Sequence, residues 1–339
     1  MQNKNLAVGY FENESFKDVC APYLGRISEV FFGWPGILNC RSVGGESCVP
    51  SARMVEELRW CRSNGLRLDA LFNCNCYGEH AMDDIMRDEV LNALDAMRAC
   101  GLLPDVVTTT SPFVAQIIRD AQLKIRLRAS VNMRIHGSIG FEACAELFDE
   151  YYVSRERQRD FTYMERMRQW ALQNGKRLGM QVNSGCIRQC PYQTFHDNLH
   201  GHHRQRQMEA GRKIGFELFC CRKRLLDDHA YEDILKGTWV RPEDTCFWEP
   251  YVSFLKLSTR RVPFPEKIIR AYAERHFDGN LLELLDPMLA HGVDDCVIAN
   301  DRFPSNWAQS GIGGACANDC THCGRCRMVL EQVLENCYS

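Results

Sequence analysis

The chain has 339 residues, of which 45% are hydrophobic and 25% are charged, as in an ordinary soluble globular protein. Its formal net charge of −3 gives no electrostatic reason to expect DNA or a membrane as partner, and no apolar run approaches the length of a bilayer span. The N-terminal residues lack the unbroken apolar core of a signal peptide, so we expect a cytoplasmic protein.

Short β-rich runs alternate with amphipathic helical patterns along most of the chain. Helical patterns such as those over 51–65, 88–101 and 160–175 begin at a capping Ser or Asp and close near a glycine. This alternation indicates a parallel sheet with crossover helices, and about eight repeats favour a closed TIM-like (β/α) barrel over an open sheet. The expected strands cover 6–10, 29–34, 68–73, 106–109, 125–130, 151–154, 178–183 and 252–257.

We expect two parts in the chain. Residues 1–277 form the barrel, and residues 278–339 form a cysteine-rich appendage whose apolar content is too low for a core of its own. In such a barrel, the residues that follow each strand converge on one rim, and this rim carries the active site.

The chain contains 19 cysteines. So many cysteines in a cytoplasmic protein of this size need an explanation. Their number is odd and no export signal precedes them, so we expect metal clusters rather than disulfides. The densest run is Cys316, Cys320, Cys323 and Cys326, with gaps of three, two and two residues. Such short gaps are typical of cubane iron–sulfur clusters, whereas zinc sites separate two cysteine pairs more widely. Zinc and a metal-free run remain the alternatives, and Cys326 is the least certain ligand.

A second constellation lies in the middle of the chain. Cys186 follows an expected strand end and Cys190 precedes a proline. Either Cys220 or Cys221, together with Cys246, would complete four thiolate ligands at long range. The alternative is that Cys220 is a core residue and Cys246 a buried thiol.

Three segments carry a family resemblance: residues 105–132, 180–198 (MQVNSGCIRQCPYQTFHDN) and 239–260 (WVRPEDTCFWEPYVSFLKLSTR). They resemble peptidase family U-thirty-two (U32), the collagenase-like proteins, and the resemblance covers about residues 5–275. It implies a barrel-like domain and a 4Fe–4S cluster on Cys186, Cys190, Cys221 and Cys246, with Cys220 competing for the third place. The resemblance also implies oxygen-independent hydroxylation of ubiquinone precursors or RNA bases. The protease activity in the family's name is chemically doubtful.

The chain departs from the family in two respects. The gap between Cys186 and Cys190 is shorter than in the typical member, and the C-terminal cysteine run is not a general family feature. We therefore expect a divergent member with one 4Fe–4S cluster, or with two if the C-terminal run also binds iron.

Four further residues are candidates for the chemistry. His196 lies closest to the cysteines and forms a possible acid–base pair with Asp197, although a solvated histidine-rich face explains it as well. Asn183, Lys256 and Arg260 follow or end expected strands on the same rim, where the two cations would bind an anionic substrate. The competing interpretation is a structural ion pair with Glu243 or Asp244.

The combined expectation is a redox enzyme, such as an oxygen-independent hydroxylase of an aromatic small molecule or an RNA base. The alternative is an electron-transfer or scaffold subunit that serves a redox partner or a paralogous subunit. A collagenase-like protease is the third candidate, but no G-x-S-x-G or H-E-x-x-H motif occurs in the chain.

Overall fold

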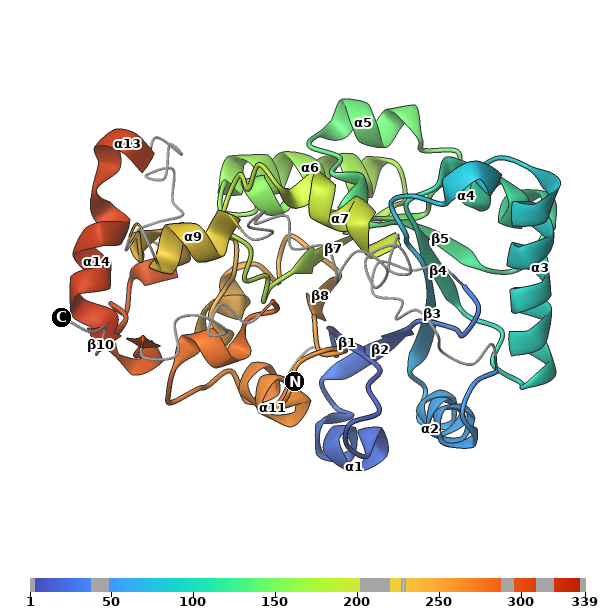
Figure 1. The fold of residues 1–339 in the computed structure, drawn as a ribbon, viewed down its shortest axis with the longest axis horizontal. Coiled ribbons are helices and arrows are strands. Elements are labelled where there is room, and N and C mark those ends of the chain that lie inside the picture. The colour runs from blue at the N-terminus through green and yellow to red at the C-terminus, as the bar shows by residue number, and fades with distance from the viewer. Residues whose placement is uncertain are drawn as a thin grey trace, which may run out of the picture.

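The structure, a computed structural model, describes residues 4–37, 49–201, 220–226, 228, 230–287, 296–308 and 320–335. Eight parallel strands pair in chain order and close into a barrel, with β8 hydrogen-bonded to β1 (Figure 1). All eight expected strands are present, with ends that differ by no more than two residues, so the predicted barrel is confirmed. The strands are β1 (Leu6–Gly9), β2 (Ile27–Phe32), β3 (Arg67–Phe72), β4 (Val106–Thr109), β5 (Arg126–Ala129), β6 (Glu150–Tyr152), β7 (Arg177–Gln181) and β8 (Phe254–Leu257).

Helices surround the barrel, and most of the main ones begin at a capping Ser or Asp, as predicted. The Ser51 side chain accepts from the Met54 amide at the start of α2, and Asp160 caps α6 in the same way. The helix expected over 88–101 begins earlier, because Asp83 caps it. No described helix has the length and apolar character that crossing a membrane requires. The main helices around the barrel are α1 (Phe16–Cys20), α2 (Ala52–Ser63), α3 (Asp84–Ala99), α4 (Pro112–Asp120), α5 (Ser138–Ala143), α6 (Phe161–Gln173) and α11 (Pro265–Glu274).

The barrel interior contains a buried ionic cluster that the sequence analysis did not predict. Arg128 on β5 is fully buried and donates to both oxygens of Glu29, at 2.6 and 2.7 Å. The same guanidinium reaches Glu150 at 2.5 Å and Asp69 at 2.9 Å. Thr108 donates its hydroxyl hydrogen to the Asp69 carboxylate, with both oxygens at 2.8 Å. Burial of these charges is tolerated because each carboxylate is hydrogen-bonded.

A small apolar layer covers this cluster inside the barrel. It consists of Ala7, Phe31, Leu71, Tyr152 and Phe254, all of which are buried. Phe254 packs against the glycine face of β7, where a Cβ at Gly179 would lie 2.2 Å from the ring. The filled interior leaves the mouth at the carboxyl ends of the strands as the place for a site.

The described residues beyond position 277 share one apolar core with the barrel. Leu281, Ile298 and Val333 belong to the same buried cluster as the barrel helices. Trp307 stacks on Trp239 with ring centroids 6.2 Å apart. Helices α13 (Cys320–Cys323) and α14 (Arg325–Val333) lie at the end of the molecule opposite α3, near α9 (Cys220–Leu226) (Figure 1).

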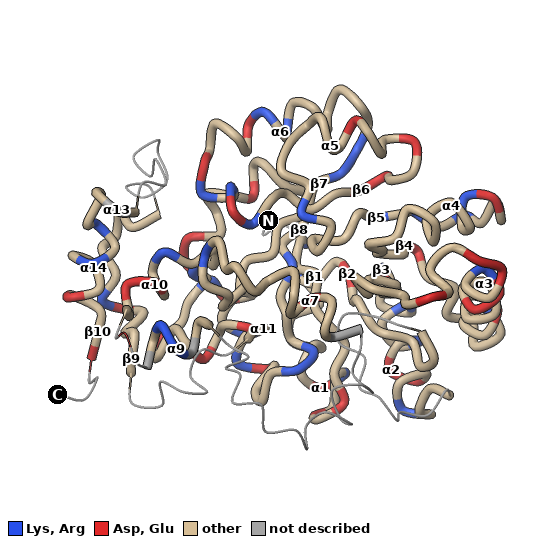
Figure 2. The backbone as a smooth tube through the Cα atoms, turned by 45° about the horizontal axis from the view of Figure 1, so that its top comes forward, with Lys and Arg blue, Asp and Glu red and all other residues tan. Residues whose placement is uncertain are grey.

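Two further features concern charge and cysteines. Lys and Arg are interspersed with Asp and Glu over most elements of the backbone (Figure 2). Cys296, just before β9 (Val297–Ile298), is disulfide-bonded, which corrects the expectation that the cysteines form no disulfides.

Candidate functional site

The cysteine loop, residues 182–192, connects β7 to α7 (Gln193–Gly201) at the carboxyl mouth of the barrel. Asn183 at its start is fully buried. Its amide nitrogen donates to the carbonyl oxygens of Ser258 and Leu284, both at 3.1 Å, and its amide oxygen accepts from the Ser258 amide at 2.8 Å. The Asn183 side chain therefore anchors the loop to β8 and to the segment after α11, instead of facing a ligand.

The loop is packed closely against the segment that contains Asp286 and Pro287. The Gly185 amide donates to the Asp286 carbonyl at 3.0 Å, and the Asp286 amide donates to the Asn183 carbonyl at 2.9 Å. A Cβ at Gly185 would lie only 2.2 Å from the Pro287 carbonyl oxygen, so a glycine is required by this close approach. This packing fixes the backbone that leads into Cys186.

The structure brings several of the predicted ligands together. The Sγ atoms of Cys190 and Cys220 are 3.6 Å apart. Burial, together with the neighbouring Cys220 and Cys186 thiols, raises the pKa of Cys190 to about 12. Thus Cys190 contacts the start of α9, and the residue in this contact is Cys220, the competitor of Cys221. Cys221 is half-buried on the same helix.

The remaining predicted ligands differ in exposure. Cys246 is exposed, and its thiol donates to the Glu243 carbonyl at 3.8 Å. Cys320 and Cys323 are exposed on α13, and Cys326 is half-buried on α14, whereas Cys316 lies outside the described residues. Within the described ranges, no three His, Cys, Asp or Glu side chains stand close enough to hold a metal ion.

His196 lies on α7 beside two aromatic rings. Its ring centroid is 6.0 Å from that of Tyr192 and 5.9 Å from that of Phe195. Its expected acid–base partner, Asp197, forms an ion pair with Arg134. The Asp197 carboxylate is therefore directed to the arginine that follows β5.

The two predicted cations occupy different positions. Lys256 on β8 is buried inside the barrel, with its Nζ 4.4 Å from the centroid of the Phe31 ring and 5.1 Å from that of Tyr152. The stem of Arg260 packs against Gly9 at the end of β1, where a Cβ would lie 2.5 Å from its Cγ.

The carboxylates of the competing interpretation are engaged with other groups. Asp244 forms a two-point ion pair with Arg241, at 2.7 and 3.0 Å. Glu243 accepts from the Asn300 side chain at 2.9 Å and from the Phe277 amide at 2.7 Å. Neither arrangement involves Lys256 or Arg260.

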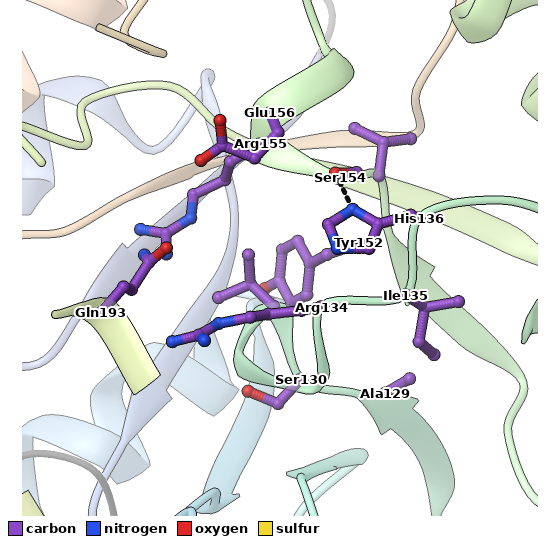
Figure 3. A pocket seen from close by; sticks show the side chains of 12 residues that line it. Ala129, Ser130, Arg134, Ile135, His136, Tyr152, Ser154, Arg155, Glu156 and Gln193 are labelled. Carbon is purple, nitrogen blue, oxygen red and sulfur yellow. Dashed lines mark hydrogen bonds between the residues drawn. The ribbon is translucent and has the colours of Figure 1, made fainter. Parts of the chain in front are cut away.

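A small cavity, the rim pocket, opens at the carboxyl ends of β5 and β6, beside the cysteine loop. Its volume is about 30 Å³, and Ser130, Arg134, His136, Tyr152, Ser154 and Arg155 are among the residues that line it (Figure 3). His136 Nδ1 lies 3.0 Å from Ser154 Oγ, and Arg155 Nη1 donates to Ser184 Oγ at 3.0 Å. The sequence analysis did not single out these residues as a site. Their position after two predicted strands was the available signal, but their convergence depends on the fold.

Comparisons with known proteins give one protein of similar sequence and one solved structure of similar fold, each over most of the chain. The uncharacterized protease MJ1657 of Methanocaldococcus jannaschii is 22% identical over 302 residues, which cover 83% of this chain and 81% of the relative. Among solved structures, the U32 peptidase Mk0906 matches with a TM-score of 0.52 and 13% identity, over 76% of this chain and 92% of that one. No protein-family model matches the sequence.

Proposed function

We propose that this chain, which resembles the U32 peptidases in sequence and in fold, is an iron–sulfur redox enzyme. Its reaction is an oxygen-independent hydroxylation, or a related oxidation, of an aromatic small molecule or an RNA base. The observation that carries the proposal is the 3.6 Å contact between the Cys190 and Cys220 thiols, with Cys186 on the same loop as Cys190, at the barrel mouth where barrel enzymes hold their substrates.

The donor chemistry of this site fits an iron–sulfur cluster. Thiolates are the ligands of such clusters, and the thiols of Cys190 and Cys220 come from two separate segments that a cluster would bridge. A bound 4Fe–4S cluster supplies one-electron transfer beside the mouth. Cys246 or Cys221 is the fourth ligand in this proposal.

The chain's own residues prepare the site for that chemistry. Asn183 and Gly185 hold the cysteine loop against β8 and Pro287. The apolar layer of Phe31, Leu71 and Tyr152 closes the barrel beneath the mouth. A substrate would therefore bind above this layer, next to the cysteine loop.

Anaerobic purification followed by iron and sulfide analysis tests the proposal. We expect brown protein with acid-labile sulfide, and we expect Cys186→Ser/Cys190→Ser to remove about half of the iron if two clusters form, or nearly all if one forms. Cys144→Ser is the matched control, since Cys144 is half-buried near Tyr151, away from the mouth. Stoichiometric zinc without sulfide, or unchanged iron in the double variant, contradicts the proposal.

The C-terminal cysteines favour an alternative in which the chain is an electron-transfer or scaffold subunit. Cys320 and Cys323 are exposed on one helical turn, where a cluster would be accessible to a redox partner. Cys320→Ser/Cys323→Ser separates the two functions. If the double variant loses electron transfer to an external acceptor but still binds substrate, the subunit is favoured. If it keeps both, the enzyme with a single cluster is favoured.

A hydrolase is favoured by one observation only, the contact between Ser154 and His136 in the rim pocket. A serine beside a histidine is the beginning of a nucleophile–base pair. Among the described residues, however, no carboxylate is recorded on the second ring nitrogen of His136. Labelling with a fluorophosphonate decides the matter: modification of Ser154 that is lost in Ser154→Ala supports the hydrolase, and no labelling removes it.

A further inference from the structure

The electrostatic balance of the rim pocket is positive. Arg134 is neutralised by Asp197, and the Glu156 carboxylate is paired with Arg188 of the cysteine loop at 3.8 Å and accepts from the Gln189 amide at 3.1 Å. Across the described ranges, Arg155 has no carboxylate partner, and its guanidinium donates to the hydroxyl oxygen of Ser184. A half-buried guanidinium without a counterion attracts an anion.

Arg134 adds an unsatisfied donor. Its Nε is buried and has no hydrogen-bond partner among the described residues. Its backbone is left-handed, with φ of 53°, a conformation that arginine seldom adopts. Such strained residues are common at ligand sites, because the surrounding structure holds them in place. In Figure 3, the Arg134 and Arg155 side chains extend toward the same side of the pocket, near Gln193.

The volume of the pocket selects the ligand group. A cavity needs roughly 10–15 Å³ per water molecule, so the rim pocket, with about 30 Å³, holds about two water molecules. Two waters are replaced by the two oxygens of one carboxylate, which matches the planar fork of an arginine. A tetrahedral phosphate, with more oxygens, matches this volume less well than a carboxylate does.

We propose that the rim pocket is a carboxylate subsite, in which Arg155 binds the carboxylate of a small organic substrate and Arg134 Nε assists. The proposal rests on the proposed function, because it places the rest of that substrate at the mouth, beside Cys186. Ser184 links the two, since its Oγ accepts from Arg155 and it lies two residues before Cys186. The substrate class is thus a carboxylic acid and not an RNA base.

Calorimetric titration of the anaerobically purified full chain with benzoate tests the subsite, with benzamide as its uncharged analogue. We expect benzoate to bind more tightly than benzamide, and Arg155→Gln to weaken benzoate binding by about 10- to 100-fold, as for other charge-assisted hydrogen bonds. Arg157→Gln is the matched control, because Arg157 is on the same turn and pairs with Asp160 at 2.9 Å. The Arg157→Gln variant should bind benzoate with the same affinity as the wild type.

Arginine modification of the wild-type protein gives a second readout that needs no variant. Benzoate should protect Arg155, but not Arg157, from phenylglyoxal, as measured by peptide mass spectrometry. No benzoate binding at millimolar concentration, equal binding to Arg155→Gln, or no protection overturns the subsite. Iron content separates the two proposals. Iron-free protein that binds benzoate through Arg155 contradicts only the cluster, and iron-loaded protein without such binding contradicts only the subsite.

Discussion

At the scale of single residues, the barrel interior places three carboxylates around one guanidinium. Arg128 contacts Glu29, Asp69 and Glu150, and its partners come from three other strands. Arg67 and Arg177 also contact Glu150, at 2.7 and 2.9 Å. Removing one member of such a cluster leaves buried charges without a partner, which costs more than the net contribution of the intact cluster.

Arg128→Met should therefore lower the free energy of unfolding by about 3–5 kcal/mol. Urea denaturation followed by circular dichroism measures the loss. Arg126→Met is the control, because Arg126 lies on the same strand but is exposed, and it should change stability by less than about 0.5 kcal/mol. Equal free energies of unfolding for the two variants would contradict a stabilising role of Arg128.

Asp69 should make stability depend on pH. Burial raises its pKa from 3.8 to about 7, with the nearby Glu29 adding to the rise and Arg128 opposing it. The folded state then binds a proton that the unfolded state has released, so this contribution to stability is complete below about pH 4 and is lost as the pH rises toward 7.

Asp69→Asn should flatten this dependence. We expect the free energy of unfolding of the wild type to fall more steeply between pH 4.5 and pH 7 (about the window set by the Asp69 pKa) than that of the variant, as measured by urea titrations across the range. The slope is compared, because the substitution also changes the absolute stability. Parallel slopes for the two proteins would place the Asp69 pKa outside this window.

At the scale of elements, the cysteine loop depends on the segment packed against it. Gly185 faces the Pro287 carbonyl so closely that a methyl group requires the backbone to move. The loop and α9 contribute separate thiols, so a shift of the loop changes the distance between Cys190 and Cys220.

Gly185→Ala should lower the free energy of unfolding by about 1–3 kcal/mol and lower the iron content of anaerobically purified protein. Gly25→Ala is matched to it, because a Cβ at Gly25 meets nothing within 4 Å. If Gly185→Ala has the free energy of unfolding and the iron content of the wild type, the loop adapts without moving its cysteines.

At the scale of the whole molecule, the C-terminal part and the barrel unfold together in our interpretation, because they share one core. Trp307 stacks on Trp239, contacts the Phe303 ring at 5.2 Å, and lies under the Arg159 guanidinium at 5.6 Å. A single cooperative transition is expected where no separate core exists.

Trp307→Ala should remove about 3–5 kcal/mol of stability, the usual cost of deleting a buried tryptophan side chain. Differential scanning calorimetry should show one transition in the wild type and a lower midpoint in the variant. Ile139→Ala, at a side chain that is 83% exposed, should leave the midpoint unchanged. Two resolved transitions in the wild type would contradict the shared core.

The barrel could be predicted from the sequence because its signals are local. Runs of β-branched residues such as 106–109, and helix caps such as Ser51 and Asp160, depend on neighbouring residues within a turn or a strand. The resemblance to the U32 family also came from contiguous segments, and the comparisons confirm it. The candidate cysteines were recognised for the same reason, since Cys186 and Cys190 are four positions apart.

Pairing across long distances in the sequence was decided only by the tertiary structure. Glu29, Asp69 and Glu150 lie far apart in the sequence, and they come together only because the barrel closes around Arg128. Lys256 was expected at a substrate pocket, but the inward face of β8 places it within the barrel. The choice of Cys220 as the neighbour of Cys190, and the meeting of Arg134 with Arg155, also depend on strand register and barrel closure. Local sequence determines what each element is, whereas the contacts between elements are set by packing over the whole molecule.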